Sequence, residues 1–105
     1  MRAEAQNNAE AIEKSLALLR QRIGWEDVEH RLEEFNALTE DPDLWNDPDK
    51  AQKLMRERQN LMDAYEKCTS MMQELSDQIE LIEMGEAEGD DEIVAEAEAA
   101  LTALR

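Results

Sequence analysis

The first third of the chain alternates apolar and polar positions with a helical period. From Glu10 onward, apolar side chains recur every three or four residues, at Ile12, Leu16, Leu19 and Ile23. A second series with the same spacing comprises Trp25, Val28, Leu32, Phe35 and Leu38. Each series marks one face of a helix, but the two do not join smoothly across Gly24. The pattern predicts helical structure over residues 9–38, with either a break or a kink at Gly24.

The middle of the chain carries the longest pattern, which we call the seam. Its positions follow a three–four spacing without a lapse: Ala51, Leu54, Arg58, Leu61, Tyr65, Cys68, Met72, Leu75, Ile79 and Ile82. This spacing is typical of a coiled coil and predicts a helix over residues 48–84, which Gly85 would end in a left-handed conformation. The apolar side chains of the seam can be buried only against a partner. That partner is either the first helical segment, folded back on the seam, or a second chain.

Residues 40–48 predict a sharp corner between these two patterns. Asp41 and Asp47 can each cap the turn that follows, while Pro42 and Pro48 suit first helical positions, where a missing N–H costs nothing. Trp45 lies between them, and we expect it to plug the seam, with its indole N–H bonded to a partner. Arg58, the one charged seam residue, is expected to send its guanidinium to a neighbouring carboxylate.

Residues 85–91 read as a flexible acidic linker, followed by a last helix over residues 91–105. Asp90 or Asp91 can cap this helix, whose apolar face carries Val94, Ala97, Leu101 and Leu104. With 105 residues, three glycines and two prolines, the chain is expected to form one domain, residues 1–105, with little room for a sheet. The predicted fold is all-α: an elongated antiparallel helical hairpin or bundle of about three helices with coiled-coil-like packing.

Charge narrows the choice of partners. The net charge is −16, and residues 73–105 contain eleven acidic side chains and one basic one. Such a surface repels phosphate, so the sequence argues against DNA and anionic membranes as direct partners and favours a basic protein. A single cysteine, no apolar leader and no long apolar run predict a cytoplasmic protein.

The residues that could carry chemistry are few. His30 is the only histidine, and we expect it on a helix surface; Cys68 occupies a seam position and is expected to be a small buried residue. The aspartates after residue 40 do not fit a calcium loop, because Asn46 and Gln52 stand where glycine and glutamate are needed. The sequence therefore predicts no catalytic residue, no metal and no cofactor.

Two further groups of side chains have alternative interpretations. Lys50, Lys53, Arg56 and Arg58 form the only basic cluster, which is either a solvated, salt-bridged face or a small contact with RNA or an acidic surface. The first is favoured, since acidic residues are interleaved with the cluster. The methionines at and beside the seam are interpreted as core rather than as an adaptable binding groove.

Three stretches of the chain resemble the release factor 2 family of bacterial class I peptide chain release factors. They are RLEEFN at residues 31–36, DPDLWNDP at 41–48 and KAQKLMRER at 50–58. The motif that is most specific to this family comprises Asp41, Pro42, Trp45, Asn46, Asp47, Pro48, Ala51 and Gln52. The resemblance is strongest over residues 25–65 and points to the amino-terminal helical domain of such a factor.

The resemblance implies a function in translation termination. Members of the family recognise UAA and UGA on the ribosome with a Ser-Pro-Phe tripeptide and promote peptidyl-tRNA hydrolysis with a Gly-Gly-Gln loop. Neither motif occurs in this sequence, so the chain is not expected to be an enzyme. The resemblance implies two kinds of partner. One is the remaining domains of the same factor. The other is the ribosome, which the full-length factor would contact at a stalk-base protein of the large subunit and at neighbouring RNA. An autonomous acidic coiled-coil protein that dimerises through its seam is the alternative.

Overall fold

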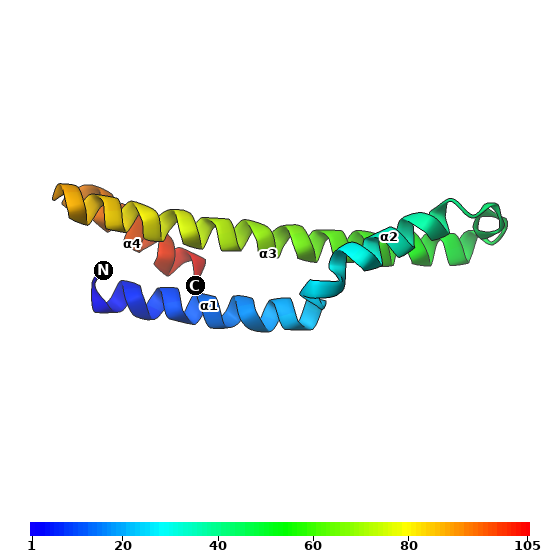
Figure 1. Ribbon diagram of the computed structural model, residues 1–105, viewed down its shortest axis with the longest axis horizontal. Helices are drawn as coiled ribbons and strands as arrows, with labels where there is room; N and C mark the ends of the chain where they lie inside the picture. The colour runs from blue at the N-terminus through cyan, green and yellow to red at the C-terminus, as the bar shows by residue number, and fades with distance from the viewer. The chain divides into compact units, whose positions relative to one another are not determined.

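A computed structural model describes residues 1–105 and confirms the all-α class (Figure 1). Four α-helices follow one another: α1 (Ala3–Ile23), α2 (Val28–Thr39), α3 (Pro48–Glu88) and α4 (Asp91–Leu104). Two short 3₁₀ helices, η1 (Trp25–Asp27) and η2 (Pro42–Asn46), lie on either side of α2. None of these helices combines the length and apolar character that crossing a bilayer would require.

The first predicted helix is two helices, because the chain breaks at Gly24. Gly24 has φ 77° and ψ 55°, a left-handed conformation that glycine adopts without steric cost. Helix α1 also begins at Ala3, earlier than the predicted residue 9. Buried Ala5 and Ala9 continue the stripe of Ile12 and Leu16 toward the N-terminus, but alanine gives only a weak hydrophobic signal in a sequence.

The chain forms two compact units. Unit 1 comprises residues 1–19 and 68–105, and unit 2 comprises residues 20–67. In unit 1, the early part of α1, the later part of α3 and all of α4 surround one apolar core. Its fully or nearly fully buried members are Ala5, Ala9, Ile12, Leu16, Cys68, Leu75, Ile82, Val94, Ala97 and Leu101.

In unit 2, α2 runs antiparallel to the early part of α3. The rings of Trp25 and Tyr65 stack at one end of this pairing, with centroids 4.8 Å apart and planes inclined by 22°. Further along, the Arg58 Nε donates to the Asn36 Oδ1 at 3.0 Å. The expected carboxylate partner for Arg58 is therefore wrong, because an amide on α2 lies within reach instead. Val28, Leu44, Ala51 and Leu61 are buried in this unit.

None of the ten seam positions is exposed. They are buried or half-buried by other parts of the same chain, so a second chain is not needed to cover them. The folded-back arrangement, one of the two left open by the sequence, accounts for their burial.

The predicted end of the long helix is wrong. Helix α3 continues through Gly85 to Glu88, and Gly89, with φ 70°, takes the left-handed position. The expected linker over residues 85–91 shrinks to Gly89 and Asp90 before α4 begins. Gly85 serves close packing instead, since a Cβ there would lie 2.8 Å from the Val94 Cγ2 and 3.2 Å from the Asp90 carbonyl oxygen. Asp90 caps α4 by accepting a hydrogen bond from the Ile93 amide at 3.2 Å.

Candidate interaction surface at the α2–α3 corner

The corner between α2 and α3 is built from two aspartate caps. Asp41 has an extended backbone, and its Oδ1 accepts from the Asp43 amide at 3.0 Å, while Pro42 opens η2. Asp47 repeats the arrangement six residues later: its Oδ1 accepts from the Lys50 amide at 3.2 Å, ahead of α3. The two caps satisfy amides that have no partner within their own helices, and so fix where each begins.

Trp45 does not plug the seam, and this expectation is wrong. Its side chain is 56% exposed, whereas the preceding residue, Leu44, is 7% exposed and supplies the buried contact of η2. Side chains in a 3₁₀ helix are about 120° apart, so two neighbours cannot both face inward. The indole does find a partner, because the Trp45 Nε1 donates to the Thr39 carbonyl oxygen at 3.0 Å.

This hydrogen bond leaves an apolar ring presented outward in a fixed orientation. The polar atom of the indole is used within the protein, so the exposed part of Trp45 is carbon surface. Leu38 near the end of α2 and Met55 in α3 are also exposed, at 49% and 39%. We call residues 38–55 the corner surface. Among these residues, an exposed tryptophan whose orientation is fixed by a hydrogen bond is the best candidate for contact with another protein.

The remaining family-motif residues divide between core and solvent. Ala51 is buried on the inner side of α3, whereas Asn46 and Gln52 are exposed. Ala51, which is 5% exposed, thus contributes to the core. The exposed amides are free to contact another molecule.

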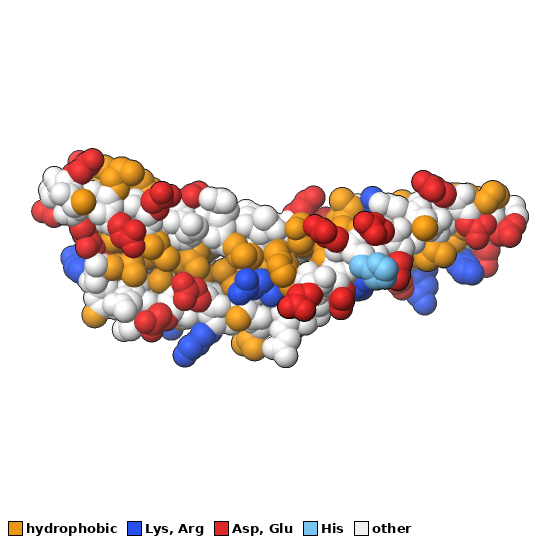
Figure 2. Space-filling view, viewed as in Figure 1, with side chains coloured by type: hydrophobic (Ala, Val, Ile, Leu, Met, Phe, Trp, Pro, Cys, Tyr) orange, Lys and Arg blue, Asp and Glu red, His pale blue; other side chains and the backbone are white.

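Charge on the corner surface is mainly negative. Five carboxylates, those of Glu40, Asp41, Asp43, Asp47 and Asp49, accompany two lysines, Lys50 and Lys53. Figure 2 shows acidic, basic and apolar side chains intermixed on the part of the molecule where α2 meets the start of α3. Lys53 and Arg56 are exposed and make no ion pair within 4.0 Å, so the predicted solvated face is present without its salt bridges.

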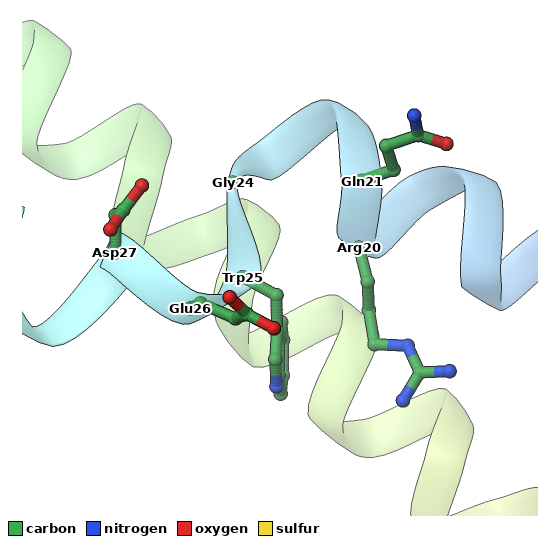
Figure 3. A pocket seen from close by; sticks show the side chains of 6 residues that line it. All are labelled: Arg20, Gln21, Gly24, Trp25, Glu26 and Asp27. Carbon is green, nitrogen blue, oxygen red and sulfur yellow. The ribbon is translucent and has the colours of Figure 1, made fainter.

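A pocket of about 430 Å³ lies at the turn between α1 and α2 (Figure 3). Its lining residues are Arg20, Gln21, Gly24, Trp25, Glu26 and Asp27. The side chains of Arg20 and Trp25 extend to the same side of the turn in Figure 3. The lining carries charges of both signs and no nucleophile, so we treat the pocket as part of the packing around the Trp25–Tyr65 stack.

The two reactive side chains singled out from the sequence lie where expected. His30 is exposed on α2, with its Nε2 2.8 Å from the Glu34 carboxylate, and Cys68 has no exposed surface. A surface histidine and a small buried cysteine are thus confirmed. No group of three or more histidine, cysteine, aspartate or glutamate side chains is placed to hold a metal ion.

An all-α chain with a capped corner and a long seam defines a helical module, and the comparison with known families identifies its class. The family described as PCRF domain matches residues 28–105, and the chain belongs to that family. Its relatives are more specific. Peptide chain release factor 2 of Roseobacter denitrificans is 60% identical over 99% of this chain, and that of a Ruegeria species is 58% identical over the whole chain.

A more distant relative gives the same family. Peptide chain release factor 2 of Paramagnetospirillum magneticum is 47% identical over the whole chain. The predicted membership of the release factor 2 family is therefore confirmed. The chain spans 28% of the length of each of these three relatives, so it corresponds to one part of each of them.

Proposed function

We propose that this chain is the accessory amino-terminal helical domain of a peptide chain release factor 2. Such a factor directs translation termination at UAA and UGA codons and promotes peptidyl-tRNA hydrolysis on the ribosome, in the cytoplasm. The observation that carries the proposal is identity of 58–60% over essentially the whole chain to proteins bearing that name. The domain itself is not the catalyst, since its sequence contains neither Gly-Gly-Gln nor Ser-Pro-Phe.

We further propose that the domain positions the factor near the stalk base of the large subunit, through the corner surface. The support is the outward, hydrogen-bonded Trp45 within a mainly acidic segment. A rigid aromatic side chain loses little conformational entropy on binding, and surrounding carboxylates favour a basic protein partner. The rest of the factor would carry codon reading and hydrolysis.

Ribosome binding by the complete factor tests the role of the corner surface. Trp45→Ala is expected to weaken binding roughly 10- to 100-fold, the range of an exposed aromatic hot spot, with unchanged codon choice. Leu18→Ala is the matched control, because Leu18 is 66% exposed but lies on α1, outside the corner surface. Equal ribosome affinity of the Trp45→Ala factor and the unaltered factor would rule out this role.

A release assay tests the domain assignment itself. A factor lacking residues 1–105 is expected to hydrolyse peptidyl-tRNA at UAA and UGA, but only at higher factor concentration. Hydrolysis by the 105-residue chain alone would contradict the proposal. Sedimentation at several concentrations tests the alternative, an autonomous dimer: the seam is already covered within one chain, so we expect a monomer.

A further inference from the structure

Helices α3 and α4 form a tightly connected pair within unit 1. Only Gly89 and Asp90 separate them, and the Asp90 amide donates to the Gly85 carbonyl oxygen at 2.8 Å. Gly85 lets α4 approach so closely that Val94 occupies the space where a Cβ would lie. A short connection and close apolar packing hold the pair together.

Helix α1 is held to this pair differently. Small side chains make up much of its buried face in unit 1, where Ala5 and Ala9 lie beside the larger Ile12 and Leu16. The same face buries a polar residue, Asn8. Hydrophobic side chains gather between α1 and the α3–α4 pair in Figure 2, but alanines bury little apolar area per residue.

Polar contacts supply the rest of the attachment. The Met1 α-amino group lies 2.8 Å from the Glu86 carboxylate, and the Arg2 Nε donates to the Glu98 Oε1 at 2.9 Å. Glu98, through its hydrogen bond and its charge, raises the pKa of the Arg2 guanidinium, the direction expected when a carboxylate stabilises its charged form. Arg2 is largely exposed, so water can replace this contact at small cost.

Asn8 makes two further contacts with α4. Its Nδ2 donates to the Thr102 Oγ1 at 3.2 Å, and its Oδ1 accepts from the Arg105 Nη1 at 2.9 Å. Both partners lie at the exposed end of α4, where water can reach them once α1 moves away. The contacts fix the position of α1 along α4 without burying apolar surface.

We propose that residues 3–19 of α1 are a strap, which opens from the α3–α4 pair while that pair stays folded. The contacts of the strap exchange for water more readily than the packing inside the pair, which is the condition for local opening. In the turn that follows α1, the side of Gly24 on which a Cβ would lie is open, since that Cβ would meet no atom within 4 Å. Opening uncovers an apolar face of α3 and α4. This inference does not depend on the proposed function.

Cys68 is placed to report this opening. Helices α1 and α3 run antiparallel from the Met1–Glu86 contact, so equal rise along both puts Cys68 opposite the turn that contains Leu16 and Leu19. Helix α4 ends at Leu104, which lines a groove with Ser70 and Met71, about half a turn from Cys68 along α3. The end of the strap therefore lies opposite the fully buried Cys68, whose thiol should become accessible when the strap opens.

Thiol labelling with Ellman's reagent, read beside amide hydrogen exchange of the whole chain, tests the strap. Asn8→Ala is expected to speed Cys68 labelling roughly tenfold and Arg2→Ala roughly two- to fivefold, while protected amides of α3 and α4 exchange at their former rates. Lys14→Ala is the control, because Lys14 is exposed on α1 and makes none of these contacts; its labelling rate should not change.

Two results would overturn the proposal. One is a labelling rate that neither Arg2→Ala nor Asn8→Ala alters. The other is labelling that accelerates together with exchange in α3 and α4, because unit 1 would then open as one cooperative body. Neither result involves the ribosome. A result against the opening of the strap is therefore distinct from a result against the proposed function.

Discussion

Leu44 and Trp45 are adjacent in η2 but lie in opposite environments. Leu44 faces the interior of unit 2, and Trp45 keeps more than half of its surface in solvent. The larger ring is thus not the residue that stabilises the corner. The fold does not require a tryptophan at this position. The presence of Trp45 in the family motif therefore fits a role in binding.

Alanine substitutions at these two positions should differ in cost. Leu44→Ala is expected to lower the free energy of unfolding by about 2–4 kcal/mol, as for a buried leucine. Trp45→Ala should cost only about 1–2 kcal/mol, from one hydrogen bond and a partly buried ring. Urea denaturation of both variants measures the difference. A larger loss for Trp45→Ala would mean that the ring is buried.

Capping by Asp47 predicts a position-specific effect at the start of α3. Asp47→Ala removes the acceptor for the Lys50 amide and should cost about 1 kcal/mol. Asp49→Ala is the matched control, because this carboxylate lies in the same first turn without capping it. Its loss should cost only a few tenths of a kcal/mol, through the helix dipole. Equal losses would show that charge, not the cap, sets the stability of this helix start.

The packing of α3 against α4 turns a normally helpful substitution into a harmful one. In a free helix, Gly85→Ala would stabilise by about 1 kcal/mol. Here the added methyl meets the Val94 side chain and the Asp90 carbonyl, so we expect a net loss of about 1–2 kcal/mol. A double-mutant cycle with Val94→Ala checks this, because the smaller side chain should recover part of the loss. Additive effects would exclude the close approach.

Charge acts on the whole chain. Twenty-seven acidic side chains face eleven basic ones, and the structure has two ion pairs between an amino or guanidinium group and a carboxylate to offset their repulsion. Screening should therefore stabilise the fold, whereas it weakens proteins that depend on surface ion pairs.

Thermal unfolding in increasing NaCl tests this balance. We expect the Tm near neutral pH to rise by a few degrees between about 0.05 and 0.5 M salt. Close to the isoelectric pH of 4.2, where the net charge vanishes, the same salt series should produce little change. A Tm that falls with salt at neutral pH would show that the ion pairs outweigh the repulsion.

Features that depend on neighbours along the chain were readable from the amino-acid order. The seam, the aspartate caps and the interruption at Gly24 arise from side-chain spacing and hydrogen bonds within a few residues, so a linear pattern contains them. Contacts between distant segments were not readable. Leu44 rather than Trp45 faces inward, Gly85 continues a helix and Asn8 is buried, because each environment is created by helices that meet only after the chain folds back.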